Sequence, residues 1–191
     1  AAKSGLPHKG NFVMNKHKAG EKEGTYIFTA SYADKGANGM KPLVATEVLA
    51  LSYPLIGADK FKEAKKATTF LVTPEIWKEL KEDITIVLPA HEAMVRYEGI
   101  DLTDVGQIKL GIAVAPSYFS GGHLAIYSGV DSTEPIGSVD LEIGLTDLGF
   151  KELLVNLKPT EGRHDLVLKT TCNDPSKVFA GIVSMEFIKR K

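Results

Sequence analysis

The stretch "HLAIYSGVDSTEPIGSVDLE", residues 123–142, decides the fold. Alternating apolar residues on either side of a polar break predict two strands, at 123–128 and 136–143. Asp131 and Ser132 suit the start of a turn, Pro135 fixes φ, and Gly137 relieves crowding where the chain re-enters a sheet. The break has three readings: an ordinary turn, the rim of a ligand site, or the trace of a family template.

Short strands of the same kind fill most of the chain, and their spacing is typical of a β-sandwich. The Gly/Asn/Pro break at 34–42 divides the chain into an N-terminal hairpin and linker, 1–42, and a sandwich, 43–191. The strands are expected at 11–15, 24–33, 46–53, 67–72, 84–89, 93–99, 107–115, 123–128, 136–143, 151–157, 164–171 and 178–188.

One segment, "TPEIWKELKED" at 73–83, predicts a short helix. Thr73 suits the N-cap, and Pro74 suits the first helical position, where a missing N–H costs nothing. Ile76, Trp77 and Leu80 would then share one apolar face, so Trp77 is expected to pack in the core. The predicted fold is all-β: a jelly-roll sandwich with one short helix and an N-terminal hairpin.

Composition excludes several classes of function. The chain has 191 residues, 43% hydrophobic and 25% charged, with a net charge of −1. A near-neutral charge argues against nucleic acid or a membrane surface as partner, and no apolar run approaches the ~18 residues that a membrane span needs. Cys172 is the only cysteine, so no intrachain disulfide forms and cysteine-cluster zinc sites are excluded.

Enzyme signatures are missing from the sequence. It contains no Gly-Xaa-Ser-Xaa-Gly elbow, Gly-rich phosphate loop, His-Glu-Xaa-Xaa-His motif or EF-hand loop. No two histidines stand at metal-ligand spacing on one element. His164, at the start of a strand, is expected to be structural. We therefore assign no catalytic residue.

Four segments together resemble the family-six type of carbohydrate-binding module, a galactose-binding-domain-like jelly roll. They cover about residues 46–191 in the family's order, and the hairpin "LAIYSGVDSTEPIGSVDL" (124–141) resembles a hairpin of the module. The others are "LIGADKFKEA" (55–64), "VRYEGIDLTDVGQIKLGIAVA" (95–115) and "GRHDLVLKTTCNDPSKVFAGIVSMEF" (162–187). The resemblance implies a non-catalytic module that binds carbohydrate and targets a larger protein to polysaccharide.

The front piece, "GTYIFTASYADKGANGMKPLV" (24–44), is similar to a hairpin that precedes such modules in large exported bacterial proteins. Those proteins combine c-type cytochrome domains with quinoprotein-like sugar dehydrogenase or trehalose-utilisation-type domains. This resemblance implies that the chain is the C-terminal part of a multidomain protein that is periplasmic, cell-surface or extracellular. Its partners would then include the upstream domains.

The family's structural calcium and sugar cleft are only partly matched. Where the family has two acidic residues in its opening strand, this chain has Gly57 and Asp59, so Asp59 is the one candidate calcium ligand. Where its last strand reads Asn-Ile-Asp, this chain has Gly181, Ile182 and Val183. Phe150 is the aromatic nearest to the position of the cleft tryptophan.

Sugar sites need an aromatic ring to stack on a pyranose and polar groups to bond its hydroxyls. The candidate aromatic residues are Tyr97, Tyr118, Phe119 and Phe150, and the candidate polar residues are Asn173, Asp174 and Lys177. Trp77 would be the strongest stacking ring, but its place on the apolar face of the expected helix favours the core. Each has a structural alternative. The aromatics would pack at the rim of the core or on a neighbouring domain, and the polar residues would cap a turn.

Three hypotheses remain open at this point. The chain is a carbohydrate-binding-like module, or a docking sandwich whose degenerate cleft binds no sugar, or an enzyme with an unrecognised carboxylate site.

Overall fold

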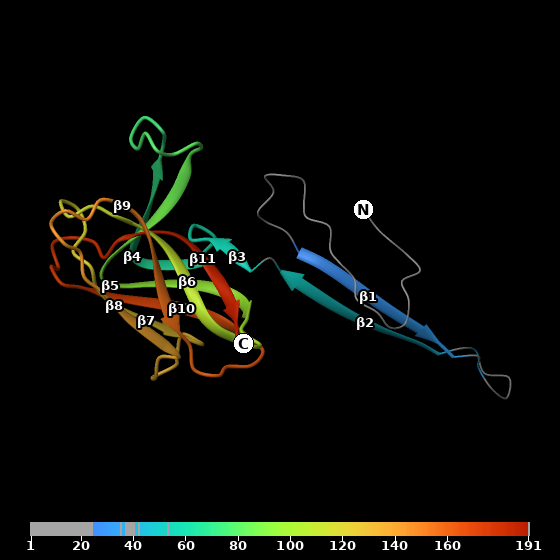
Figure 1. Ribbon diagram of the computed structural model, residues 1–191. Helices are drawn as coiled ribbons and strands as arrows, with labels where there is room; N and C mark the ends of the chain where they lie inside the picture. Colours follow the sequence, from blue (N-terminus) through green and yellow to red (C-terminus); the bar gives the residue numbers. More distant parts are fainter. Residues whose placement is uncertain (1–24, 35, 37–40, 42, 53, 191) are drawn as a thin grey trace. The chain divides into compact units, whose positions relative to one another are not determined.

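The computed structural model describes residues 25–34, 36, 41, 43–52 and 54–190 (Figure 1). It divides into two compact units, Ala1–Tyr53 and Pro54–Lys191. Every regular element in the described residues is a strand, which confirms the all-β prediction. A helix with the length and apolarity needed to cross a bilayer is not found in this part of the chain.

The first unit is an antiparallel hairpin of β1 (Thr25–Ala33) and β2 (Val44–Ser52). Asp34 fixes its connection, because its Oδ1 accepts hydrogen bonds from the backbone N–H groups of Gly36 and Leu43, each at 2.9 Å. The strand at 44–52 thus pairs with β1, and the division between units falls after Tyr53 rather than after residue 42. The strand predicted at 11–15 lies outside the described residues.

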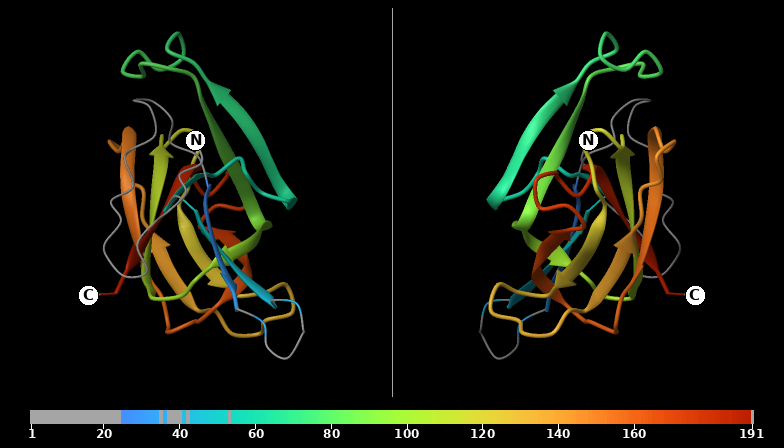
Figure 2. Two further views of the ribbon diagram at one scale, coloured as in Figure 1. Left: turned by 90° about the vertical axis from the view of Figure 1, so that its right-hand side faces the viewer. Right: turned by 90° about the vertical axis from the view of Figure 1, so that its left-hand side faces the viewer.

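The second unit is one sheet wrapped into a nearly closed sandwich (Figure 2). Its strand order is β8-β7-β10-β5-β11-β6-β9, with β3 paired to β11 and β4 paired to β5. The strands are β3 (Leu55–Gly57), β4 (Glu63–Val72), β5 (Ile84–Asp101), β6 (Val105–Val114), β7 (Gly122–Tyr127), β8 (Gly137–Leu141), β9 (Gly149–Asn156), β10 (Arg163–Cys172) and β11 (Gly181–Lys189).

Alternation places one face of each strand in the core. On β6, Ile108, Leu110 and Ile112 are at most 1% exposed, while the residues between them face outward. Strand β5 was expected as two strands, at 84–89 and 93–99, but it is continuous. Its residues 84–89 pair with the outer part of β4. After an irregularity where Glu92 has a φ of 55°, its residues 94–96 pair with β4 on one side and β10 on the other.

The stretch at 123–142 forms the expected hairpin, with β7 and β8 in register from Gly122 opposite Leu141 to Ile126 opposite Gly137. Its polar break is a surface turn. Gly137 is required by crowding, because a Cβ there would lie 2.5 Å from the carbonyl oxygen of Asn156. The backbone N–H of Lys158 also donates to the carbonyl of Ile136 at 2.7 Å. The stretch therefore brings the two ends of the wrapped sheet together.

The predicted helix at 73–83 is wrong. The segment is a loop between β4 and β5 that contains one α-turn, closed by the N–H of Trp77 and the carbonyl of Thr73 at 2.9 Å. One turn does not offset the cost of nucleating a helix, and Ile76 is 59% exposed instead of packing on the core. The far ends of β4 and β5 carry this loop beyond the body of the sandwich (Figure 1).

Candidate functional site

An aromatic pair joins the projecting loop to β9. The ring centroids of Trp77 and Phe150 lie 4.8 Å apart at an interplanar angle of 44°. Phe150 is 40% exposed and Trp77 is half-buried, so both rings remain accessible. Trp77 is therefore not a core residue, contrary to the expectation that came with the helix.

The surface beside Phe150 is apolar and closed. Phe150 lies opposite Ala113 on β6, and Ala113 lies opposite Gly181 on β11, so the three positions share the outward face of the sheet. A Cβ at Gly181 would lie 2.8 Å from the Cδ1 of Ile86. Because Ile86 already fills this space, no polar side chain reaches the floor next to the ring pair at these positions.

Further along the same outward face, the sheet becomes polar. The Nζ of Lys109 lies 2.7 Å from the Oε2 of Glu186 and 3.1 Å from the Oε1 of Glu152, and these contacts raise the pKa of the lysine. Farther on, the Nε2 of Gln107 donates to the Oδ1 of Asn156 at 2.8 Å. An aromatic pair at one end and charged and amide groups along the strands form a surface suited to hydroxyl-rich ligands.

The loop at 115–121 is divided between core and solvent. Phe119 is 9% exposed, whereas Tyr118 is 71% exposed. Phe119 also forms a parallel bridge with Val178, so the loop is fastened to the segment before β11. Of the two adjacent aromatics, only Tyr118 is available to a ligand.

The structure brings Asn173, Asp174 and Lys177 next to that loop. The Nδ2 of Asn173 donates to the carbonyl of Ser120 at 3.3 Å, and the Nζ of Lys177 donates to the carbonyl of Pro116 at 2.9 Å. The Oδ1 of Asp174 accepts from both the N–H and the hydroxyl of Ser176, which lowers the pKa of this carboxyl. Asn173 and Lys177 therefore tie the two loops together, and Asp174 caps a turn within its own loop.

Tyr97 lies in the core at 1% exposure, so no surface ligand can reach it. Its hydroxyl donates to the carbonyl of Ala58 at 2.7 Å, and burial raises the pKa of the phenol. The candidate aromatics therefore occupy three environments: Tyr97 and Phe119 are internal, Tyr118 stands on a loop, and Phe150 is paired with Trp77.

The side chains at the calcium positions do not fit a calcium ion. Gly57, Asp59 and Val183 do converge, since the N–H of Ala58 donates to the carbonyl of Val183 at 2.9 Å. Only Asp59 carries a carboxylate, however, and its Oδ2 lies 3.6 Å from the Nζ of Lys60. Calcium normally takes 6–8 oxygen ligands. Within the described part of the chain, no group of three or more His, Cys, Asp or Glu side chains could hold a metal.

Sequence reasoning assigned Trp77 to the core, although it would be the strongest stacking ring of the chain. The helical spacing of Ile76, Trp77 and Leu80 favoured that assignment. Two signals argued the other way: the segment is shorter than a stable helix, and it holds the only tryptophan of the chain among charged residues. Its contact with Phe150 joins residues distant in sequence and follows from no local pattern.

Comparisons with known proteins identify structures that share this fold. No protein-family model matches the chain, and no curated protein matches its sequence. Solved structures do match. A β-1,3-glucan-binding family 6 module from Bacillus halodurans superposes with a TM-score of 0.57 at 16% identity, covering 70% of this chain and 93% of that chain.

Two further family 6 modules agree. The module from Clostridium cellulolyticum, solved with xylose, has a TM-score of 0.58 at 17% identity, over 71% of this chain and 96% of that chain. The module from Cellvibrio mixtus lichenase 5A, solved with cellotriose, has a TM-score of 0.55 at 10% identity, over 72% and 97%. The described sandwich thus has the jelly-roll fold of the family 6 carbohydrate-binding modules.

Proposed function

We propose that this chain is a non-catalytic glycan-binding module, with Trp77 and Phe150 as its stacking platform. One observation carries the proposal: two accessible aromatic rings meet at the edge of an outward sheet face lined with amide and charged groups. Aromatic rings stack on the apolar face of a sugar, and flanking polar groups bond its hydroxyls. The fold agrees, because the structures it matches are carbohydrate-binding modules.

The geometry of the pair restricts how a sugar would bind. Two stacking contacts of about 3.5–4.0 Å each are needed to hold a sugar between two rings, and the centroids are only 4.8 Å apart. The sugar therefore stacks on the outer surface of the pair, unless the projecting loop moves away from β9. Glu152 and Lys109 lie farther along this face and would bond the hydroxyls of an extended chain.

The test is calorimetric titration of the chain with β-glucans, xylans and neutral microbial glycans. We expect Trp77→Ala and Phe150→Ala each to weaken binding by about 2 kcal/mol, as for other aromatic anchors. Tyr118→Ala is the matched control, because Tyr118 is exposed but lies on a different loop. If Tyr118→Ala abolishes binding and Trp77→Ala leaves it unchanged, the platform has been assigned to the wrong residues.

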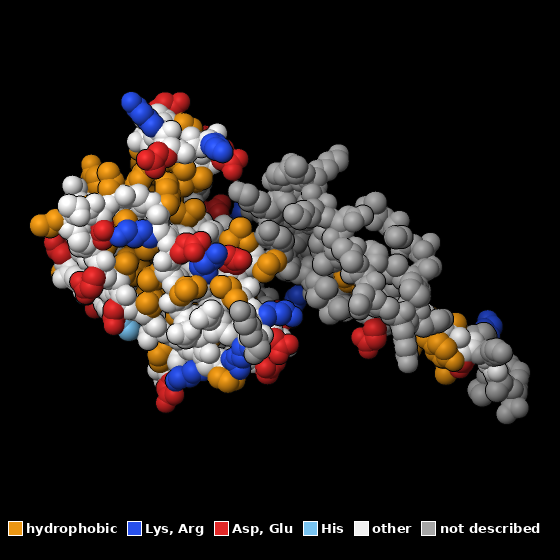
Figure 3. All heavy atoms as spheres, in the orientation of Figure 1, with side chains coloured by type: hydrophobic (Ala, Val, Ile, Leu, Met, Phe, Trp, Pro, Cys, Tyr) orange, Lys and Arg blue, Asp and Glu red, His pale blue; other side chains and the backbone are white. Residues whose placement is uncertain are grey.

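A docking role is the second candidate, and exposed apolar side chains favour it. Leu145 is 96% exposed and Leu148 is 72% exposed in the loop before β9, and Ile76 is 59% exposed beside Trp77. Hydrophobic side chains also gather beneath the charged tip of the projecting arm (Figure 3). Exposed apolar patches mark interaction surfaces. Wild-type chain that binds no glycan in the titration would favour this candidate.

The context of the module is also a proposal. The resemblance of residues 24–44 supports an exported, multidomain parent protein that the module targets to polysaccharide. Export would be tested by fractionating the source cells and detecting this chain with an antibody. Detection in the cytoplasm alone would contradict it.

A further inference from the structure

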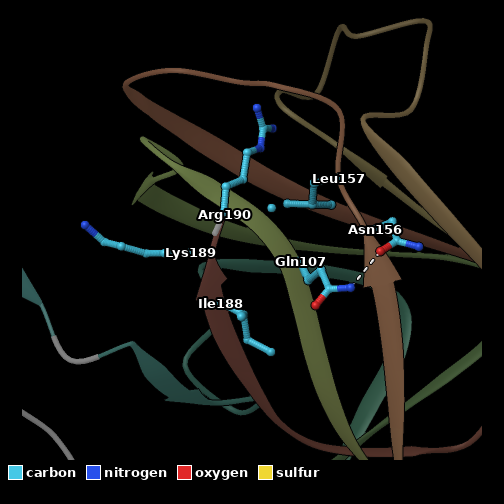
Figure 4. Close-up of a pocket in the computed structure, with 7 residues that line it drawn as sticks. Gln107, Asn156, Leu157, Ile188, Lys189 and Arg190 are labelled. Carbon is cyan, nitrogen blue, oxygen red and sulfur yellow. Dashed lines mark hydrogen bonds between the residues drawn. The ribbon is translucent and has the colours of Figure 1, made fainter.

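A hollow lies at the other end of the outward sheet face, where β9 and β11 end and β6 begins (Figure 4). It has a volume of about 560 Å³. Its lining combines a glycine, two amides, two apolar side chains and two cations: Gly106, Gln107, Asn156, Leu157, Ile188, Lys189 and Arg190. Asn156, which lines the hollow, lies six residues along β9 from Phe150. The hollow is therefore separate from the aromatic pair.

Arg190 lines the hollow, and two hydrogen bonds fix its position. Its backbone N–H donates to the carbonyl of Asp104 at 2.8 Å, and its Nη2 donates to the carbonyl of Val105 at 3.3 Å. A Cβ at Gly106 would lie 2.7 Å from the Cγ of Arg190, so the arginine stem occupies the space that the glycine leaves. The guanidinium is thus positioned by the backbone rather than by an acidic partner.

The charge of Arg190 is not neutralised by its surroundings. Across residues 54–190, no carboxylate lies within ion-pair distance of the guanidinium, whereas Lys109 on the same face is paired with two glutamates. Most N–H groups of the guanidinium remain available, and a guanidinium binds a carboxylate or a sulfate through two parallel hydrogen bonds. The charge therefore favours an oxyanion.

The other walls suit the ring that would carry the oxyanion. Ile188 is apolar and partly exposed, so it can contact the C–H face of a sugar, whereas Leu157 is 8% exposed and closes the hollow on the core side. In Figure 4 the Oε1 of Gln107 points toward Ile188, while its Nε2 is bonded to Asn156. The side chain of Lys189 extends away from both amides. We propose that this hollow is a second site, which binds the carboxylate or sulfate of an acidic sugar through Arg190.

This inference rests on the proposed function only in taking a sugar as the carrier of the anion, and its test does not use the aromatic pair. The ¹⁵N-labelled full chain is titrated with glucuronate, glucose 6-sulfate, glucose and sodium sulfate while the NMR signals of Gly106, Gln107 and Arg190 are followed. We expect one or both acidic sugars to bind at least about tenfold more tightly than glucose. The two arms distinguish carboxylate from sulfate.

Three variants separate a shaped site from simple attraction of anions. Arg190→Gln should remove the preference for the acidic sugar, and Gly106→Ala should weaken it by displacing the arginine stem without changing the charge. Lys169→Gln is the matched control: it removes the same charge from β10, where the lysine lies over the ring of Tyr127 and outside the hollow, and should leave affinity within about twofold. Equal losses from Arg190→Gln and Lys169→Gln would overturn the proposal.

Two further outcomes would also overturn it: acidic sugars that bind no better than glucose, and sodium sulfate that binds as tightly as they do. The proposed function is judged separately, by the effect of Trp77→Ala on neutral glycans. Loss of neutral binding in that variant, together with an unresponsive hollow, would retain the platform and reject the second site.

Discussion

The indole ring of Trp77 packs on the phenyl ring of Phe150, with 4.8 Å between their centroids. This contact ties the projecting loop to the start of β9. Both rings keep solvent access, and the proposed function gives the pair a larger role in ligand binding than in the stability of the sandwich. Several measurements separate these two roles.

Phe150→Ala should lower the free energy of unfolding by about 1 kcal/mol, which is the scale of an aromatic pair at the surface. Phe119→Ala, at a residue only 9% exposed, should cost about 3–5 kcal/mol because it leaves a cavity. Urea denaturation of the two variants gives both values. Equal losses would mean that Phe150 is part of the core.

Tyr97→Phe should destabilise the chain by about 1–2 kcal/mol, because it leaves the buried carbonyl of Ala58 without the hydroxyl at 2.7 Å. Glycan affinity should not change, since Tyr97 is 1% exposed. Thermal melts and calorimetric titration test the two halves of the prediction. A variant that remained fully stable but lost affinity would return Tyr97 to the binding site.

The sequence predicted the parts of the fold that rest on local alternation. Residues 123–142 gave the β7–β8 hairpin and the need for glycine at 137, because both depend on neighbours in the chain or on backbone crowding. The helix at 73–83 was mispredicted because Thr73 and Pro74 are good helix starters, whereas the segment lacks a buried face. Propensity is overridden when the apolar side of a short helix has nothing to pack against.

The candidate site was predictable only in part, because it depends on contacts between distant strands. Phe150 was identified from its position in the family pattern, and its partner Trp77 was assigned to the core. Tyr97 was expected at a strand end, yet β5 continues past it to Asp101, and the side chain points inward. Which face a residue takes on a strand with an irregularity cannot be read from alternation alone.

A chain that begins at Pro54 should fold alone with a cooperative melt. The shortened chain retains every strand of the sandwich. It also keeps the pairing of β3 with β11 and the hydrogen bond from the N–H of Phe187 to the carbonyl of Pro54 at 2.7 Å. A chain that begins at Leu43 would keep β2 without β1, its only partner in the described residues, and should gain no stability from it. Aggregation of the Pro54 chain would show that the first unit is integral to the sandwich.

Asp101 should contribute to the pH dependence of stability. Hydrogen bonds from Thr103 lower the pKa of its carboxyl in the folded chain, relative to about 3.9 when unfolded. A lowered pKa gives stability that is present above the unfolded value and is lost as pH falls through the folded one. The difference in unfolding free energy between wild type and Asp101→Asn should therefore shrink from pH 7 to pH 3. A difference independent of pH would contradict this assignment.

Trp77 is the only tryptophan in the chain, so its fluorescence reports directly on the platform. The central claim is tested by titrating the wild-type chain with a glycan that calorimetry shows to bind, while tryptophan emission is recorded. We predict a saturable change in emission with the calorimetric dissociation constant, and a weaker affinity by both methods in Phe150→Ala. A glycan that binds by calorimetry without changing the emission of Trp77 would contradict the account.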